Sequence, residues 1–371
     1  MAQSPGCRAM DAGGMSGDTG VWTVAPHADY PRPPTLSRSN KKQPKPPRPG
    51  LTMADLARLA GVSKITVSRA LADSPLVSVK TRERVQKLAR EHGYKLNVNA
   101  RNLRLRRSHT VAVIVEMQPS SDRTMWDPYP LTLLGGISQE LTSSGYSVLL
   151  TTREGAAAAA VRGADGVILL GQGERQDAVR RFDKLGLPMV VWGAQSASDR
   201  HVVVGSDNRH GGVSVAERFV SIGRRHPVFI GNPDHPEIAE RLHGFVDELA
   251  SHGIKPLLLR RDEFTLASGV DAVHSLARRK VRFDSIFACS DLLAMGAIRA
   301  LVELGYQVPS DVSVVGYDDS PLGASFLPPL SSVRQDWQTG GMLLARKVLE
   351  LVEGKPAHSE MLPTTLVLRS T

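Results

Sequence analysis

The side chains with the clearest chemistry lie at the start of a short predicted helix, Lys64–Ala72. Lys64 could donate hydrogen bonds to guanine or to phosphate, Ile65 could pack on a thymine methyl group, and Arg69 could read guanine. Side chains at the start of such a helix can reach base edges in the major groove of DNA. The predicted chemistry is therefore sequence-specific binding of double-stranded DNA.

Two short helices and a tight turn are expected to position these side chains. Periodicity predicts a first helix over Met53–Ala60. Gly61–Ser63 is the turn, because glycine supplies backbone freedom and Ser63 can accept a hydrogen bond from the free amides of the next helix. Two short helices joined in this way form a helix-turn-helix. The positions expected in its core are Leu56, Leu59, Ala60, Val67 and Leu71.

Two further helical segments follow the turn motif. The pattern of residues 78–92 predicts a helix with Ser78 as its N-cap, and Gly93 ends it. Val85, Leu88 and Ala89 are expected to pack under the first two helices. Residues 97–105 form a shorter and very basic helical segment, and an isolated helix of this length is marginal in water. We expect this segment to become helical only on DNA and in pairs.

Residues 51–107 resemble the DNA-binding head of the lactose-repressor (LacI) family of bacterial regulators. The resemblance implies that Lys64, Ile65 and Ser68 determine which DNA sequence is bound, whereas Thr66, Val67 and Arg69 belong to the shared motif. A second set matches phosphate-contacting or neighbouring positions, with capping or plain solvation as the alternative role: Thr52, Ser63, Ser78, Thr81, Tyr94 and Asn97. The matching pieces are Thr52–Ala57, Ala60–Ser63, Thr66–Leu71, Val77–Ser78, Thr81–Val85 and His92–Tyr94.

The same resemblance places residues 97–105 at the hinge helix of the family, with Ala100 and Leu103 at its minor-groove positions. Leu103 is a large apolar side chain between basic neighbours. Alone it could serve packing, but in a symmetric dimer two copies could wedge into a central base step and kink the duplex. Anything that moves the two hinges apart would then weaken DNA binding.

The charge of the chain is unevenly distributed. The net charge is +9, and residues 51–109 carry 13 Lys and Arg against 4 Asp and Glu, whereas residues 110–371 carry 26 against 30. This asymmetry is expected of a polyanion-binding head on a nearly neutral body. No apolar run approaches the roughly 18–20 residues of a membrane helix, and only Cys7 and Cys289 are present, so we expect a cytoplasmic protein without a metal site.

Residues 1–50 are rich in Pro, Gly and Ser and are expected to be disordered. They contain no apolar core of a secretory signal. Two interpretations stay open for this basic tail. It could add nonspecific phosphate contacts, or it could result from an upstream start codon, with the working protein beginning near Leu51.

From Thr110 onward, short apolar runs alternate with amphipathic helical stretches, which implies parallel sheets covered by helices on both faces. The number of strands favours two doubly wound lobes. The predicted fold is therefore a helix-turn-helix head (51–96), a hinge helix and linker (97–109) and a two-lobed α/β body (110–371). The expected strands are 111–117, 148–152, 166–170, 189–192, 202–204, 228–230, 257–259, 286–289 and 312–316, and the expected helices include 131–144, 211–223, 238–252, 268–279 and 292–304.

The body also resembles the effector domain of the family, which is similar to periplasmic sugar-binding proteins. The resemblance is strongest at 206–212, 290–297 and 308–319. It implies three crossings between lobes, expected near 207–210, 332–337 and 355–360. One departure is that few residues separate the strand ending at Thr152 from the next, so the intervening helix must be short or missing.

Planar polar side chains and an aromatic platform in a cleft between lobes would suit a sugar. The resemblance implies that Arg241 grips the ligand, with donors that suit hydroxyl pairs or a carboxylate, and that Phe264 stacks on it. Ser290 stands where the family usually has Asn. Asn208 and Asp318 could instead be capping or crossing residues. The full set of expected effector residues is Asp127, Tyr129, Asp207, Asn208, Arg241, Phe264, Ser290 and Asp318.

The predicted function is a ligand-responsive transcriptional regulator that represses sugar-utilisation genes as a homodimer on a pseudo-palindromic operator, with no cofactor. Dimers are expected because no leucine-heptad extension follows the last strand. Alternatives are a corepressor-dependent repressor or an activator with a non-sugar effector, and a transport-type sugar-binding protein. His210, His226 and His243 lack the motifs of a hydrolase elbow, a zinc site or a P-loop, which argues against an enzyme.

Overall fold

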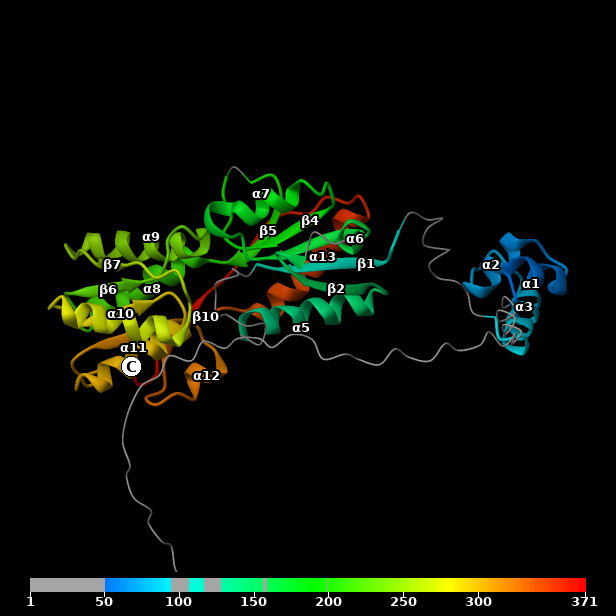
Figure 1. The fold of residues 1–371 in the computed structure, drawn as a ribbon. Helices are drawn as coiled ribbons and strands as arrows, with labels where there is room; N and C mark the ends of the chain where they lie inside the picture. The colour runs from blue at the N-terminus through cyan, green and yellow to red at the C-terminus, as the bar shows by residue number, and fades with distance from the viewer. Residues whose placement is uncertain (1–50, 95–106, 117–127, 156–158, 198) are drawn as a thin grey trace, which may run out of the picture. The chain divides into compact units, whose positions relative to one another are not determined.

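The computed structural model describes residues 51–94, 107–116, 128–155, 159–197 and 199–371 (Figure 1). The chain divides into two compact units, residues 1–96 and 97–371, and each unit is described by itself. The predictions made for the tail and for the basic helix after residue 96 lie outside the described residues.

The first unit is a bundle of three helices, α1 (Met53–Ala60), α2 (Lys64–Leu71) and α3 (Val79–Glu91). The predicted helix-turn-helix is confirmed, as is the helix that follows it. Gly61 takes a left-handed conformation with φ of 60° and ends α1, which is the reason for glycine at the turn. The buried core of the bundle consists of Leu56, Ala57, Ala60, Val67, Ala70, Val77, Val85 and Ala89.

One predicted core position of the bundle is wrong, and a second, Leu71, packs against the core but is only partly buried. Leu59 is 49% exposed, and Ala57 is buried in its stead. Leu71 is only half-buried, whereas Ala70 is fully buried.

The first sheet of the second unit is parallel throughout, with strand order β11-β5-β4-β3-β1-β2. Its register pairs Val113 of β1 with Leu150 of β2 and with Ile168 of β3. This sheet and its helices are called lobe 1 below. The strands are β1 (Thr110–Val115), β2 (Ser147–Thr152), β3 (Gly166–Leu170), β4 (Met189–Trp192), β5 (Val202–Ser206) and β11 (Glu360–Leu362).

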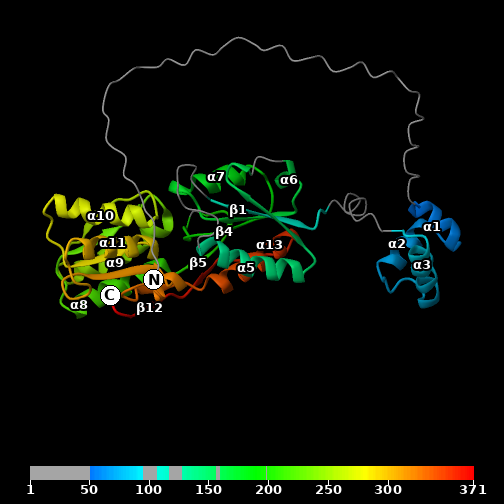
Figure 2. The same cartoon turned by 60° about the horizontal axis from the view of Figure 1, so that its bottom comes forward.

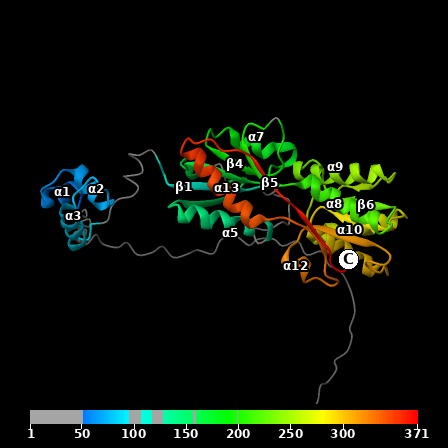
Figure 3. The ribbon, with the colours of Figure 1, turned by 180° about the vertical axis from the view of Figure 1, so that it is seen from behind.

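Helices cover both faces of lobe 1. Val113 packs in the cluster that contains α5 (Pro128–Ser143) and α13 (Trp337–Val352), which lie side by side (Figure 3). The next residue, Ile114, packs in the opposite cluster with α6 (Ala159–Arg162) and α7 (Asp177–Asp183) (Figure 2). The helix between β2 and β3 is α6, which has only four residues. The short stretch of sequence between these two strands predicts such a short helix.

The second sheet forms lobe 2, with strand order β12-β10-β9-β8-β6-β7, and all its pairs are parallel except β10 with β12. Two helix pairs flank it, with α9 and α10 on opposite sides in Figure 1. The doubly wound two-lobed body is confirmed. The elements are α8 (Asn208–Ser221), β6 (Pro227–Ile230), α9 (Pro236–Ser251), β7 (Leu257–Leu259), α10 (Leu266–Arg278), β8 (Ser285–Ala288), α11 (Asp291–Glu303), β9 (Ser313–Asp318), α12 (Pro321–Ala324), β10 (Ser331–Arg334) and β12 (Thr365–Val367).

The chain crosses between the lobes three times. The first crossing follows β5 and the second lies between β10 and α13, both where the sequence predicts them. The third lies at residues 363–364, between β11 and β12, and not at 355–360. The prediction is wrong there because β11 still pairs with β5 of lobe 1.

Candidate functional site

Helix α2 presents the side chains expected to contact DNA bases. Lys64 and Arg69 are exposed and Ile65 is 59% exposed, whereas Thr66 and Ser68 are half-buried. Val67 and Ala70 on the opposite side of the helix are buried. The amphipathic pattern thus leaves a cationic and apolar surface at the start of α2, where a groove-inserted helix makes its base contacts.

Three expected phosphate-contacting residues cap helices. The hydroxyl oxygens of Thr52, Ser63 and Ser78 accept hydrogen bonds from the backbone amides of residues 55, 66 and 81. Thr52 also takes part in a capping box, since its amide donates to the Asp55 carboxylate at 3.2 Å. The capping alternative is therefore observed, and a phosphate contact by these residues stays a prediction.

Thr81 lies in the first turn of α3, and Tyr94 follows the end of that helix. The Ser78 hydroxyl donates to the Thr81 hydroxyl at 2.9 Å. Tyr94 packs against the bundle core, and its partial burial raises the pKa of its phenol. Asn97, Ala100 and Leu103, expected at the hinge, lie outside the described residues, so the wedge at Leu103 stays a prediction.

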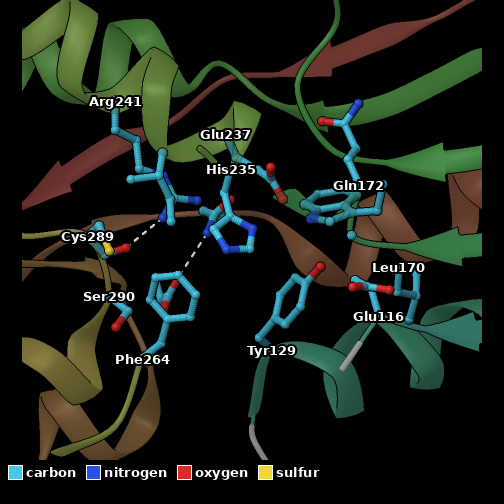
Figure 4. Close-up of a pocket in the computed structure, with 16 residues that line it drawn as sticks. Glu116, Tyr129, Leu170, Gln172, His235, Glu237, Arg241, Phe264, Cys289 and Ser290 are labelled. Carbon is cyan, nitrogen blue, oxygen red and sulfur yellow. Dashed lines mark hydrogen bonds between the residues drawn. The ribbon is translucent and has the colours of Figure 1, made fainter. Parts of the chain in front are cut away.

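A second candidate site is a cavity of about 90 Å³ between the two lobes (Figure 4). Five of the expected effector residues line the cavity, namely Tyr129 from lobe 1 and Arg241, Phe264, Ser290 and Asp318 from lobe 2. They come from separate helices, strands and loops that the fold brings together.

Contacts with other residues of the protein hold Arg241 in place. Its side chain is 8% exposed. Nε donates to Asn208 Oδ1 at 2.8 Å. Nη1 donates to the Cys289 carbonyl oxygen at 2.6 Å, and Figure 4 marks this second bond. The guanidinium lies 3.7 Å from the ring centroid of Tyr317, a cation–π contact. Burial raises the pKa of Tyr317 to about 12, so this ring stays neutral.

Close packing of α8 on α9 sets the position of Arg241. A Cβ at Gly212 would overlap the Arg241 carbonyl oxygen, and a Cβ at Gly244 would overlap the Arg209 carbonyl oxygen. The two helices can therefore approach only because each presents glycine to the backbone of the other. This approach brings Asn208 at the start of α8 within hydrogen-bond reach of Arg241.

The other expected residues of lobe 2 lie at strand and helix ends. Phe264 stands edge-on to His235, with ring centroids 5.4 Å apart. Ser290 caps α11. Asp318 accepts a hydrogen bond from Gln335 Nε2 at 2.9 Å and has φ of 129°, a conformation that L residues rarely adopt. Such strain is often stored at binding sites.

Among the described residues, two that were expected to contact the effector do not line the cavity. Asn208 acts behind it by orienting Arg241. Asp207 is exposed and caps α8, where its Oδ1 accepts from the His210 amide at 2.9 Å. Its capping role explains its place next to a strand end without a ligand. Asp127 lies outside the described residues, so its role stays a prediction.

Sequence reasoning missed several residues that line the cavity. Glu116 directly follows β1, and Gln172 follows β3, so both stand at the carboxyl ends of buried strands. This position is the usual ligand site of parallel sheets and could have identified them. Glu237 in the first turn of α9 had no comparable signal. The further lining residues missed are Trp192, His235 and Gln335.

The lobes touch each other at the edge of the cavity. The short 3₁₀ turn Glu174–Gln176 of lobe 1 reaches the loop after β6 in lobe 2. The Arg175 amide donates to the Asp234 carbonyl oxygen at 2.7 Å, and Asn232 Nδ2 donates to Glu174 Oε1 at 3.2 Å. These contacts link the lobes beside the cavity independently of the three crossings.

Neither a metal centre nor a membrane segment is found in the described parts of the chain. No three His, Cys, Asp or Glu side chains gather there in a way that could hold a metal ion. None of the helices described there has both the length and the apolar character needed to cross a membrane.

Two family models match the chain. The model described as bacterial regulatory proteins, lacI family, matches residues 52–97, and the model of a periplasmic binding protein-like domain matches residues 216–371. The transcriptional regulator CelR of Thermobifida fusca is 34% identical over 335 residues, which cover 87% of this chain and 96% of CelR. The ribose operon repressor of Haemophilus influenzae is 27% identical and covers 86% of this chain and 98% of its own length.

Solved structures give the same result. A lac repressor dimer bound to operator and an anti-inducer has a TM-score of 0.75 at 25% identity, covering 86% of this chain and 98% of that chain. A complex of CelR with cellobiose has a TM-score of 0.63 at 31% identity, covering 86% and 99%. With the helix-turn-helix and the two-lobed body both present, the chain belongs to the LacI family of bacterial regulatory proteins.

Proposed function

We propose that this protein is a sugar-responsive transcriptional repressor that acts as a homodimer on a pseudo-palindromic operator in the cytoplasm. The observation that carries the proposal is one chain with two sites. The exposed start of α2 suits the major groove, and the cavity around Arg241 suits a polar small molecule.

The class of effector follows from the cavity and from the relatives. Aromatic side chains of Tyr129, Trp192 and Phe264 border the cavity together with the fork of Arg241. Such a mixture of ring surfaces and planar polar groups suits a sugar ring. One relative has been solved with cellobiose and another is named a ribose operon repressor. A sugar or sugar derivative is the effector we propose.

The connection between the sites lies in the segment that enters β1. The amides of Ser108 and His109 donate to the two oxygens of Asp165 at 2.6 and 2.8 Å, so this segment is attached to lobe 1. A ligand that changes the angle between the lobes would move this segment and the head that precedes it. In a dimer, such movement would change the separation of the two DNA-reading helices and thereby the operator affinity.

The test is operator binding with and without ligand. Full-length protein selects its operator from random duplexes, and fluorescence anisotropy then measures affinity across a panel of mono- and disaccharides. We expect a nanomolar to micromolar complex that one sugar weakens severalfold. Failure to select any duplex would overturn the proposal. If the sugar instead strengthened operator binding, the protein would be a repressor that needs a corepressor and not one that its ligand releases from DNA.

A further inference from the structure

Two carboxylates face the cavity from opposite lobes, and each has an oxygen left without a partner. Glu116 comes from lobe 1 and Glu237 from lobe 2, and Figure 4 shows them at different sides of the cavity. Oε2 of each is buried and makes no hydrogen bond within the described residues. Arg241, whose Nε and Nη1 donate to Asn208 and Cys289, makes no hydrogen bond to either oxygen.

Glu116 is held rigidly. Its side chain is 7% exposed, and its Oε1 accepts from Arg153 Nη1 at 2.7 Å. Arg153 is in turn paired with Asp177. Burial raises the pKa of Glu116, and the guanidinium of Arg153 opposes that rise. Arg153 thus fixes one oxygen of this carboxylate, while the other oxygen is buried beside the cavity without a partner among the described residues.

Glu237 lies in the first turn of α9, after Pro236 at the first helical position. Free amides and the positive end of the helix dipole stabilise a carboxylate at this place. Its buried Oε2 nevertheless lacks a donor among the described residues. Leaving a buried carboxylate oxygen without a hydrogen bond costs free energy, so we expect whatever fills the cavity to supply a donor.

The other described polar groups that line the cavity do not donate hydrogen bonds to Oε2 of Glu116 or Glu237. Gln172 is fully buried and is satisfied on both sides, since Nε2 donates to the Ala194 carbonyl oxygen at 3.0 Å and Oε1 accepts from the Ala194 amide at 2.8 Å. Among the described lining residues, Glu116, Glu237 and Asp318 carry carboxylates, whereas Arg241 alone carries a guanidinium. A ligand with a negative charge would meet more like charge than opposite charge.

We propose that Glu116 and Glu237 select an uncharged, hydroxyl-rich effector that donates hydrogen bonds to both lobes, and that they exclude sugar acids and sugar phosphates. The inference rests on the proposed function and narrows its ligand class. One ligand hydroxyl donates to Glu116 and another to Glu237, so ligand binding also ties lobe 1 to lobe 2.

Matched probes that differ only in charge test this selection. Isothermal titration calorimetry on the full-length protein compares cellobiose with cellobionate and cellobiose 6-phosphate, and maltose, glucose and ribose with their acid and phosphate derivatives. We expect the neutral member of the bound set to bind at least tenfold more tightly than either anion. An anion that binds as tightly as its neutral parent overturns the inference, as does binding of no probe at all.

Two isosteric variants, Glu116→Gln and Glu237→Gln, assign the selection to these side chains. Hydrogen bonds to charged groups are worth about 1.5–3 kcal/mol, so each variant should weaken the neutral sugar roughly tenfold or more and narrow its advantage over the anions. Glu248→Gln, on the same helix but paired with His252 away from the cavity, should change neither value. Unchanged selectivity in both cavity variants overturns the inference.

The outcome separates this inference from the proposed function. Operator affinity and melting temperature are measured on every variant, because a folding defect would lower both. If an anionic sugar releases the protein from its operator, the proposed function stands and this inference is wrong. If neutral sugars bind through both carboxylates but leave operator affinity unchanged, this inference stands and the proposed function is wrong.

Discussion

A single buried guanidinium connects the cavity to the core of lobe 2. Arg241 uses its planar fork to bridge the Asn208 side chain and the Cys289 carbonyl while stacking on Tyr317. Lysine has the same charge but lacks the fork and the flat face. The geometry of the site therefore depends on arginine and not on positive charge alone.

We predict that Arg241→Lys weakens sugar binding at least tenfold and lowers the stability of the second unit. Loss of the fork leaves Asn208 Oδ1 or the Cys289 carbonyl oxygen unsatisfied, at a cost of about 1–3 kcal/mol. Calorimetry and chemical unfolding measure the two effects. Operator affinity without ligand should be unchanged. If the variant retains full sugar affinity, Arg241 does not contact the ligand.

Base reading by α2 should depend on Ile65. Because this side chain is 59% exposed, Ile65→Ala should change stability by no more than about 0.5 kcal/mol. If Ile65 packs on a thymine methyl group, the variant loses preference at one base pair of each half-site, worth about 1–3 kcal/mol. Selection of operators from random duplexes measures the change. An unaltered sequence preference would contradict the assignment.

At the scale of elements, reciprocal glycines bring helices together. Gly212 and Gly244 do so for α8 and α9, and Gly136 with Gly341 do so for α5 and α13, since a Cβ at any of them would overlap the facing backbone. Gly269 and Gly296 join α10 to α11 in the same way. Both lobes therefore rely on backbone-to-backbone contact between neighbouring helices.

Gly212→Ala should destabilise lobe 2 by at least about 1–3 kcal/mol, because the new methyl group overlaps the Arg241 carbonyl oxygen and pushes α9 away. Sugar affinity should fall with it, since Arg241 shifts. Gly135→Ala is the matched control: its Cβ meets nothing within 4 Å, so helix propensity predicts equal or higher stability. Equal melting temperatures for the two variants would disprove the packing argument.

The sequence predicts elements better than it predicts their partners. The apolar strands of both lobes appear where periodicity places them, because a buried parallel strand must be continuously apolar. Periodicity does not predict strand β10, because Ser331 and Ser332 are polar although they are buried. This strand belongs to the sheet because it pairs with β9. Arg241 and Phe264 of the site were found by family resemblance.

Glu116 could have been inferred from its place at the carboxyl end of β1, whereas Glu237 was not found because only the packing of the two lobes brings it to the cavity. The glycines that pair helices escaped for a similar reason. Gly212 differs from an ordinary helical glycine only through the backbone of α9 that faces it. Information of this kind resides in tertiary packing, so a pattern along one element cannot reveal it.

At the scale of the whole molecule, regulation requires that the segment entering β1 moves with lobe 1. Asp165 provides this attachment: its carboxylate accepts hydrogen bonds from the Ser108 amide and hydroxyl at 2.6 and 2.9 Å and from the His109 amide at 2.8 Å. A second attachment runs from Arg107 to the Val352 carbonyl oxygen at 3.2 Å. The Ser147 amide also donates to the His109 carbonyl oxygen at 2.8 Å, and Asp165 makes three of the hydrogen bonds that tie residues 108–109 to lobe 1.

We predict that Asp165→Ala uncouples the two sites without disabling either. Sugar affinity should stay within about twofold, because Asp165 lies outside the cavity, whereas the ratio of operator affinities without and with sugar should fall severalfold toward one. By linkage, operator DNA should then also lose its effect on sugar affinity. Asp183→Ala, an exposed carboxylate at the end of α7 in the same lobe, is the control and should preserve the full ratio. Anisotropy of a labelled operator measures the ratio, and calorimetry with and without operator measures the reciprocal effect. If Asp165→Ala retains the full ratio, the signal reaches the head by a route other than this carboxylate.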